Sequence, residues 1–152
     1  MPTLTKLAAA IVFAALAVYA VAQYITLYEH PPRQGQGVHV VAVIAALTGW
    51  KYVGARIASG FVQSVFQVLQ GVIVTVFLSL FVIGAYNVFR LGYQMRYSSL
   101  EAAFLGFVGG FVEHLTRMAQ LDFLLLLAGM IVFTGIALTL VFRWAEMRRS
   151  AG

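Results

Sequence analysis

The stretch 72–89, VIVTVFLSLFVIGAYNVF, decides the fold of this chain. It contains no charged residue, and Asn87 is its only strongly polar side chain. A helix of about 20 apolar residues crosses the roughly 30 Å hydrocarbon core of a membrane. The stretch therefore predicts a transmembrane helix, which we place at about 66–89.

The charge-free run around this stretch, 57–89, is too long for one bilayer crossing. As a helix it would extend for about 50 Å, so part of it must leave the hydrocarbon or tilt strongly. Its first half contains FVQSVFQVLQG at 61–71, with Gln63, Gln67 and Gln70. At about 100° per residue these glutamines form one narrow stripe. The stripe predicts hydrogen bonds to a neighbouring helix; the alternative is the mouth of a water-filled path.

Three further apolar runs predict spans at about 4–28, 36–54 and 122–143. The second is long enough only if Lys51 extends its amine to the headgroups. The whole chain is 62% apolar and 10% charged, with a mean hydropathy of +0.91. We therefore predict an all-α polytopic membrane bundle of four transmembrane helices, as a single membrane domain over 1–152.

The first run also has features of a secretory signal. Lys6 precedes the apolar residues, and Ala20-Val21-Ala22 resembles a cleavage site. The run from Leu7 to Tyr28 is longer than a usual signal core, so we expect a membrane span that is retained.

The basic residues predict the orientation, because cytoplasmic loops are enriched in Lys and Arg. With both termini in the cytoplasm, most basic residues lie inside: Lys6, Lys51, Arg56, Arg143, Arg148 and Arg149. Fewer lie outside: Arg33, Arg90, Arg96 and Arg117.

The segment between the last two spans predicts an amphipathic helix at about 99–118 on the outer surface of the membrane. Ser98 and Glu101 fit a capping box at its start, and Glu113 and Arg117 have the spacing of a helical ion pair. The alternatives are a helix that partly re-enters the membrane, and a fifth span, which would reverse the side of the C-terminus.

A group of ionisable residues falls on the predicted outer side. It comprises Glu29, His30, His39, Glu113, His114 and Asp122. Imidazoles and carboxylates can bind metals or relay protons, but no metal-ligand spacing such as H-x-x-x-H occurs on one helix. We therefore expect a headgroup-facing polar cluster rather than a metal site.

The sequence predicts no catalytic residue and no cofactor, and so not an enzyme. There is no Walker motif or G-x-S-x-G motif, and no acidic residue falls in the middle of a predicted span. The chain has no cysteine, which excludes disulfides and thiolate metal sites. Its net charge of +5 is scattered at the ends of apolar runs, which favours lipid rather than nucleic acid as the partner.

Several short motifs resemble the TrgA-type tellurite-resistance membrane proteins of bacteria. They are MPTLTKLAAAIVFAALA at 1–17, GWKYVGAR at 49–56, RYSSLEA at 96–102 and RWAEMRR at 143–149. Ser98-Ser99 differs from the Asp-Gly that is frequent at this turn in the family. The resemblance implies an inner-membrane protein linked to tellurite resistance, with a non-enzymatic role and no defined catalytic residues.

Two other functions remain open at this stage. The chain could be an accessory or scaffolding subunit that packs against a larger membrane complex, or a homo-oligomer. It could also be a small transporter or channel for an oxyanion. The absence of an evident inverted repeat among unequal spans counts against a transporter.

Overall fold

The structure is a computed structural model that describes residues 3–27, 36–57, 59–93 and 99–150. The described residues form helices and no strand. In chain order the helices are α1 (Thr3–Thr26), α2 (Gln36–Thr48), the π-helix η1 (Gly49–Val53), α3 (Gly54–Arg56), α4 (Phe61–Tyr93), α5 (Leu100–Met118) and α6 (Leu121–Ser150).

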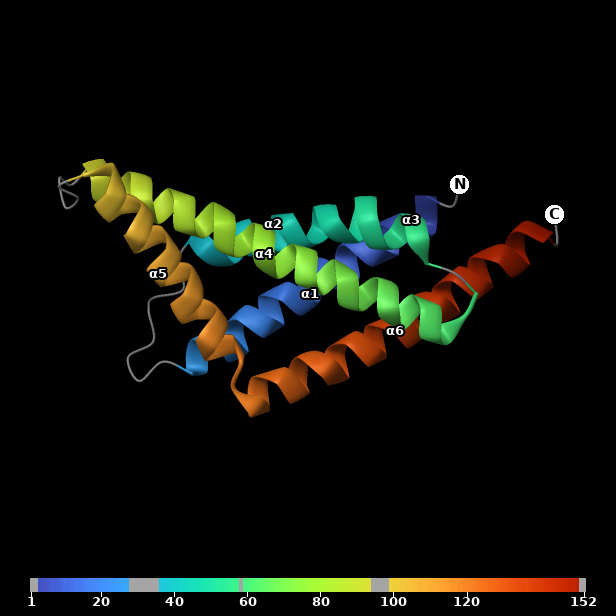
Figure 1. The fold of residues 1–152 in the computed structure, drawn as a ribbon. Coiled ribbons are helices and arrows are strands. Elements are labelled where there is room, and N and C mark those ends of the chain that lie inside the picture. The colour runs from blue at the N-terminus through green and yellow to red at the C-terminus, as the bar shows by residue number, and fades with distance from the viewer. Residues whose placement is uncertain (1–2, 28–35, 58, 94–98, 151–152) are drawn as a thin grey trace.

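Four helical segments are long and apolar enough to cross a membrane, as the sequence predicts. They are Leu4–Thr26, Gly37–Arg56, Phe61–Tyr93 and Leu121–Met147. Successive segments run in opposite directions, and both termini lie at the same end of the bundle (Figure 1). The chain is therefore an all-helical, multi-pass membrane protein.

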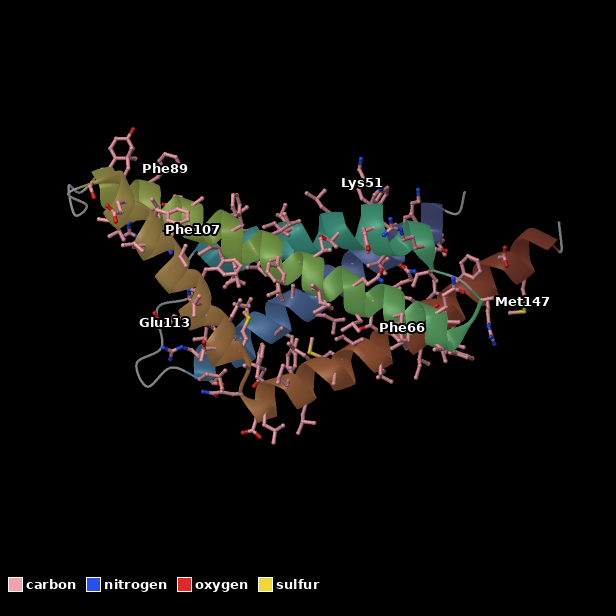
Figure 2. All side chains as sticks on the ribbon, viewed as in Figure 1. Lys51, Phe66, Phe89, Phe107, Glu113 and Met147 are labelled. Atoms are coloured by element: carbon pink, nitrogen blue, oxygen red, sulfur yellow. The ribbon has the colours of Figure 1, made fainter. Side chains whose placement is uncertain are left out.

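Large apolar side chains cover the outside of the bundle. Phe66 of α4 is 59% exposed and Phe133 of α6 is 70% exposed. Figure 2 shows side chains projecting along the whole bundle, with Lys51 pointing away from it near the terminal end. Lipid is the solvent that makes such a surface favourable, because acyl chains are as apolar as these side chains.

The second membrane segment is not one regular α-helix. Its last part is the π-helix η1, followed by the single turn α3, and the segment continues to Arg56 rather than ending near residue 54. A Cβ added to Gly49 would lie 2.5 Å from the Ala9 carbonyl oxygen, and one added to Gly54 would lie 2.8 Å from the Lys6 Cα. These glycines let η1 and α3 approach the backbone of α1 closely.

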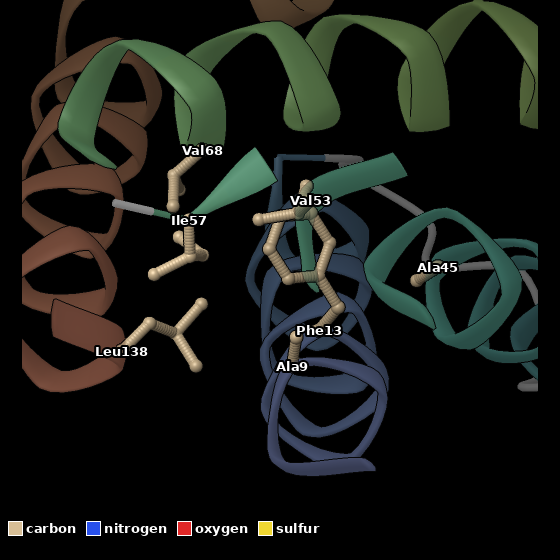
Figure 3. Packing of buried hydrophobic residues seen from close by; sticks show 7 residues of the cluster. All are labelled: Ala9, Phe13, Ala45, Val53, Ile57, Val68 and Leu138. Atoms are coloured by element: carbon tan, nitrogen blue, oxygen red, sulfur yellow. The ribbon is translucent and has the colours of Figure 1, made fainter. Parts of the chain in front are cut away.

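The hydrophobic core lies in the half of the bundle nearest the termini. Figure 3 shows its buried residues: Ala9, Phe13, Ala45, Val53, Ile57, Val68 and Leu138. Ile57 lies between Val68 of α4 and Leu138 of α6. This end of the bundle is thus filled by side chains from all four membrane segments.

The other half of the bundle is more open, because α4 and α6 diverge. They are in contact where a Cβ added to Gly135 of α6 would lie 2.9 Å from the Cα of Val65. From there the two helices separate, and α5 connects their far ends (Figure 1). The ring centroids of Phe77 and Phe111 are 5.8 Å apart, and those of Phe81 and Phe107 are 5.7 Å apart, so α5 packs antiparallel to the second half of α4.

The start of α5 corrects the predicted cap. The N-cap is Ser99, whose hydroxyl accepts a hydrogen bond of 3.1 Å from the Ala102 backbone N–H. The predicted cap, Ser98, lies outside the described residues. Ser99 has an extended backbone, with φ of −154°, which is the conformation an N-cap residue needs.

Candidate functional site

A cavity of about 720 Å³ occupies the open half of the bundle. Residues of α1, α2, α4, α5 and α6 line it, and it lies where α4 and α6 diverge. Most of its lining is aliphatic, including Leu16, Val21, Val72, Leu127 and Ile131. The volume is in the range of pockets that hold small organic ligands.

The lining of the cavity covers different lengths of the three long helices. It extends from Phe13 to Ile25 on α1, from Phe123 to Thr134 on α6 and from Val68 to Arg90 on α4. At about 1.5 Å per residue these ranges are about 18 Å, 16 Å and 33 Å long. On α1 and α6 the lining therefore corresponds to about one leaflet, roughly 15 Å, whereas on α4 it is as long as a whole hydrocarbon core of about 30 Å.

Polar side chains line the cavity near the ends of three helices, away from the core. They are Tyr24 of α1, Tyr86, Asn87 and Arg90 of α4, and His114 of α5. Asn87 and Arg90 are three residues apart, so they share one face of α4. Arg90 is exposed and forms no ion pair with any carboxylate that the structure describes.

His114 connects α5 to α1. The Tyr24 hydroxyl lies 2.7 Å from His114 Nδ1, and the Tyr24 ring also packs edge-on against Phe123 of α6. Burial lowers the pKa of His114 below its ordinary 6.5; Glu113 opposes this shift and Arg117 adds to it. The lowered pKa favours the neutral imidazole, whose Nδ1 can accept a hydrogen bond from the Tyr24 hydroxyl.

The wall of the cavity contains two buried hydroxyl groups that have no partner in the described part of the chain. Thr75 donates to the Gly71 carbonyl at 2.8 Å, as is usual for a helical threonine. The hydroxyls of Ser79 and Thr134 are buried and have no hydrogen-bond partner among the described residues. A rotation about χ1 can direct either group toward its own helix or toward a ligand.

The glutamine stripe lies outside this cavity, because none of its three residues is part of the lining. Gln70 Oε1 accepts a hydrogen bond of 3.1 Å from the Tyr52 hydroxyl of η1, which is an interhelical contact. Gln67 is partly buried, and its side-chain oxygen has no partner among the described residues. Gln63 is exposed.

The predicted outer polar residues do not come together as one site. Glu29 and His30 lie outside the described residues. His39 is exposed on α2, and Asp122 is exposed in the first turn of α6. Among the residues with described positions, no three His, Asp or Glu side chains are arranged to hold a metal ion.

Two residues of this outer group have defined partners. Glu113 and Arg117 form the ion pair that their spacing predicts, at 2.9 Å. His114 contacts Tyr24 and is the only one of the four described members of the predicted group that lines the cavity. Sequence reasoning did not single out Tyr24 or Arg90 as site residues. The spacing of Asn87 and Arg90 at the end of an apolar run was the signal that could have identified the polar end.

Comparisons with known proteins add no relative. No protein-family model, no curated protein and no solved structure matches this chain. The interpretation of the cavity therefore rests on its geometry and chemistry.

Proposed function

We propose that this chain is a non-enzymatic membrane protein that binds an apolar ligand in its bundle cavity, and that this binding contributes to tellurite resistance. The observation that supports binding is a mainly aliphatic cavity of about 720 Å³. The link to tellurite rests on the resemblance of the motifs to the TrgA-type family.

The residues of the motif GWKYVGAR, which carries part of this resemblance, make packing contacts within the bundle. Gly49 and Gly54 pack against α1, and Val53 is buried in the core. Tyr52 contacts Gln70, and the Arg56 guanidinium carbon lies 3.9 Å from the centre of the Tyr52 ring. These residues pack the terminal end of the bundle, which bounds the cavity on that side.

We place the protein in the bacterial inner membrane with both termini in the cytoplasm. Lys51, Arg56 and Arg143 lie at the terminal end of the bundle, where the bias in positive charge predicts the cytoplasm. The part of the cavity that α1 and α6 line then lies in the outer leaflet. In this arrangement α5 is an amphipathic helix at the outer surface, inclined across the cavity.

A ligand-binding role is better supported than an oxyanion channel. A channel needs a polar path through the bilayer, whereas this cavity is mainly aliphatic. On the terminal side it meets the packed core, where Ala9, Ala45, Val53 and Leu138 are fully buried. An oxyanion would lose its hydration in such surroundings without gaining enough donors.

Survival on tellurite tests this proposal. A strain that lacks the gene would receive the wild-type chain, the variant Ala20→Phe or the variant Ala15→Phe. Ala20 lines the cavity, whereas Ala15 is exposed on the same helix and outside the lining. We expect the wild-type chain and Ala15→Phe to restore growth, and Ala20→Phe to fail because its ring fills the cavity.

All three proteins must reach equal abundance in the membrane for this comparison. Growth that does not depend on the wild-type chain would refute the link to tellurite. If Ala20→Phe fills the cavity and still restores full growth, the cavity has no role in resistance.

A further inference from the structure

We infer that the cavity binds an amphiphile with an anionic headgroup, holding its tail between α4 and α6 and its head at Asn87 and Arg90. This inference rests on the proposed ligand-binding function and adds the chemical class of the ligand. The anionic group is a carboxylate or a phosphate on a long apolar chain.

The shape of the cavity fits an acyl tail. A methylene group has about the volume of a water molecule in the liquid, roughly 30 Å³, so a chain of about 16 carbons needs about 480 Å³. The cavity has about 720 Å³, which leaves space for a headgroup. Its aliphatic lining stabilises such a chain by about 0.8 kcal/mol for each methylene of a ligand that enters from water, whereas a ligand that enters from lipid gains no such term.

The distribution of polar groups defines the direction of the ligand. The deep part of the lining is formed by residues such as Val72, Leu127 and Ile131. Asn87 and Arg90 lie about 22 and 27 Å along α4 from Val72, in its last two turns. A ligand with its tail at Val72 therefore has its head at the end of the cavity that carries charge.

The charge at this end selects an anion. A guanidinium binds carboxylate or phosphate through two parallel hydrogen bonds, and the Asn87 amide beside it offers two further donors. No described carboxylate pairs with Arg90. Glu113 of α5, which is not part of the lining, is paired with Arg117 at 2.9 Å.

Photolabelling of the full-length protein in lipid nanodiscs tests this inference. Three probes of equal chain length would carry a diazirine near the end of the tail: a fatty acid, an alkyl phosphate and the neutral alcohol. We expect the tails to label cavity residues such as Val72, Leu127 and Ile131. We expect the anionic probes to label about tenfold more than the alcohol, which corresponds to one charge-assisted hydrogen bond.

Variants separate the head from the tail. Arg90→Gln should reduce labelling by the anionic probes to the level of the alcohol, and Asn87→Leu should reduce it less. Lys51→Gln, which removes the same charge from an exposed position at the opposite end, should change nothing. Ala20→Phe should reduce labelling by every probe, and Ala15→Phe by none.

The possible outcomes distinguish this inference from the proposed function. If all probes label the cavity equally and Arg90→Gln has no effect, the anionic class is wrong, although the cavity still binds apolar ligands. If labelling is confined to lipid-facing residues such as Phe66 and Phe133, both proposals are wrong. Preference for one anionic probe over the other identifies carboxylate or phosphate as the head.

Discussion

At the scale of single residues, the polar side chains in this apolar chain are placed where they find partners or water. Gln70 accepts from Tyr52, and the side chains of Thr48, Thr75 and Thr139 donate to carbonyls of their own helices. Each such bond removes the cost, several kcal/mol, of an unpaired polar group in hydrocarbon. Four other side chains have a buried oxygen without a partner among the described residues: Ser79 and Thr134 at the cavity, and Thr5 and Gln67 outside it.

The Tyr52–Gln70 hydrogen bond should stabilise the contact between η1 and α4 by about 0.6 kcal/mol, a typical value for such bonds in membrane proteins. We expect Tyr52→Phe and Gln70→Leu each to lower the free energy of unfolding in detergent. In a double-mutant cycle the two changes should be non-additive by about that amount. Additive effects would show that this bond contributes nothing, and Gln63→Leu, at an exposed position, serves as a control.

His114 should make stability depend on pH. Burial lowers its pKa below the ordinary 6.5. The unfolded chain therefore takes up a proton at a higher pH than the folded protein does. The contribution of His114 is fully present above pH 6.5 and is lost as the pH falls from 6.5 through the lowered folded value.

We expect melting temperatures in detergent to fall below pH 6.5 for the wild-type protein, and to fall less for His114→Gln. His39→Gln should keep the wild-type dependence, because His39 is exposed on α2. An identical slope in wild-type and His114→Gln would show that the titration of His114 is not coupled to folding.

At the scale of helices, glycines determine where the helices meet. Gly49 and Gly54 admit α1, Gly84 admits the Phe107 ring of α5, and Gly135 admits Val65 of α4. Small residues at such contacts let backbones approach, which is how helices associate in lipid. Other glycines, such as Gly129, have no atom within 4 Å of an added Cβ and are not contact points.

Gly135→Ala should destabilise the bundle, and Gly129→Ala on the same helix should not. The new Cβ at position 135 would lie 2.6 Å from Val65 Cγ2 and 2.9 Å from the Val65 Cα, so the backbone of α4 has to move. We expect a loss of about 1–3 kcal/mol, as for overpacking in a core. Unfolding in detergent measures both variants, and equal stability would refute the close contact between α4 and α6.

The position of α5 can be measured with single cysteines, because the natural chain contains none. Its rings at Phe107 and Phe111 contact α4, while Phe104 and Leu105 are 66% and 62% exposed and face outward. If this outward side lies in lipid, Leu105→Cys reacts slowly with a water-soluble maleimide. Glu101→Cys, in the first turn of the same helix, should react quickly. If Leu105→Cys reacted as quickly as Glu101→Cys, the outward side of α5 would lie in water.

At the scale of the whole molecule, the four membrane segments and the terminal core make one bundle that is filled at one end and hollow at the other. Contacts join α1 to α2, α1 to α6, α2 to α4 and α4 to α6. Because the number of crossings is even, both termini lie at the same end (Figure 1). The cavity and α5 lie at the opposite end.

Reporter fusions test the orientation. We expect a reporter that is active only in the periplasm to be inactive after residue 152 and active when inserted in the 28–35 connection. A cytoplasmic reporter should give the reverse result. Periplasmic activity at residue 152 would refute the four-span orientation with the C-terminus in the cytoplasm, and would favour either the opposite orientation or a fifth span.

The sequence by itself determined the helical class and the four membrane segments. A charge-free run such as 72–89 must form its backbone hydrogen bonds internally in lipid, and a helix is the way one segment does so. Local spacing also predicted a helix at about 99–118, found as α5 at Leu100–Met118, and the Glu113–Arg117 pair, because these features depend only on nearby residues. The position of this helix at the membrane surface stays a prediction.

Only the tertiary structure decided the cavity and the residues that line it. Tyr24, Asn87 and His114 are far apart in sequence, and no local pattern relates them. They share a cavity because Gly135 brings α4 and α6 together at one point, the helices diverge beyond it, and α5 connects their ends. The angle between two helices in lipid depends on how their surfaces pack, and this information is distributed over several segments of the chain.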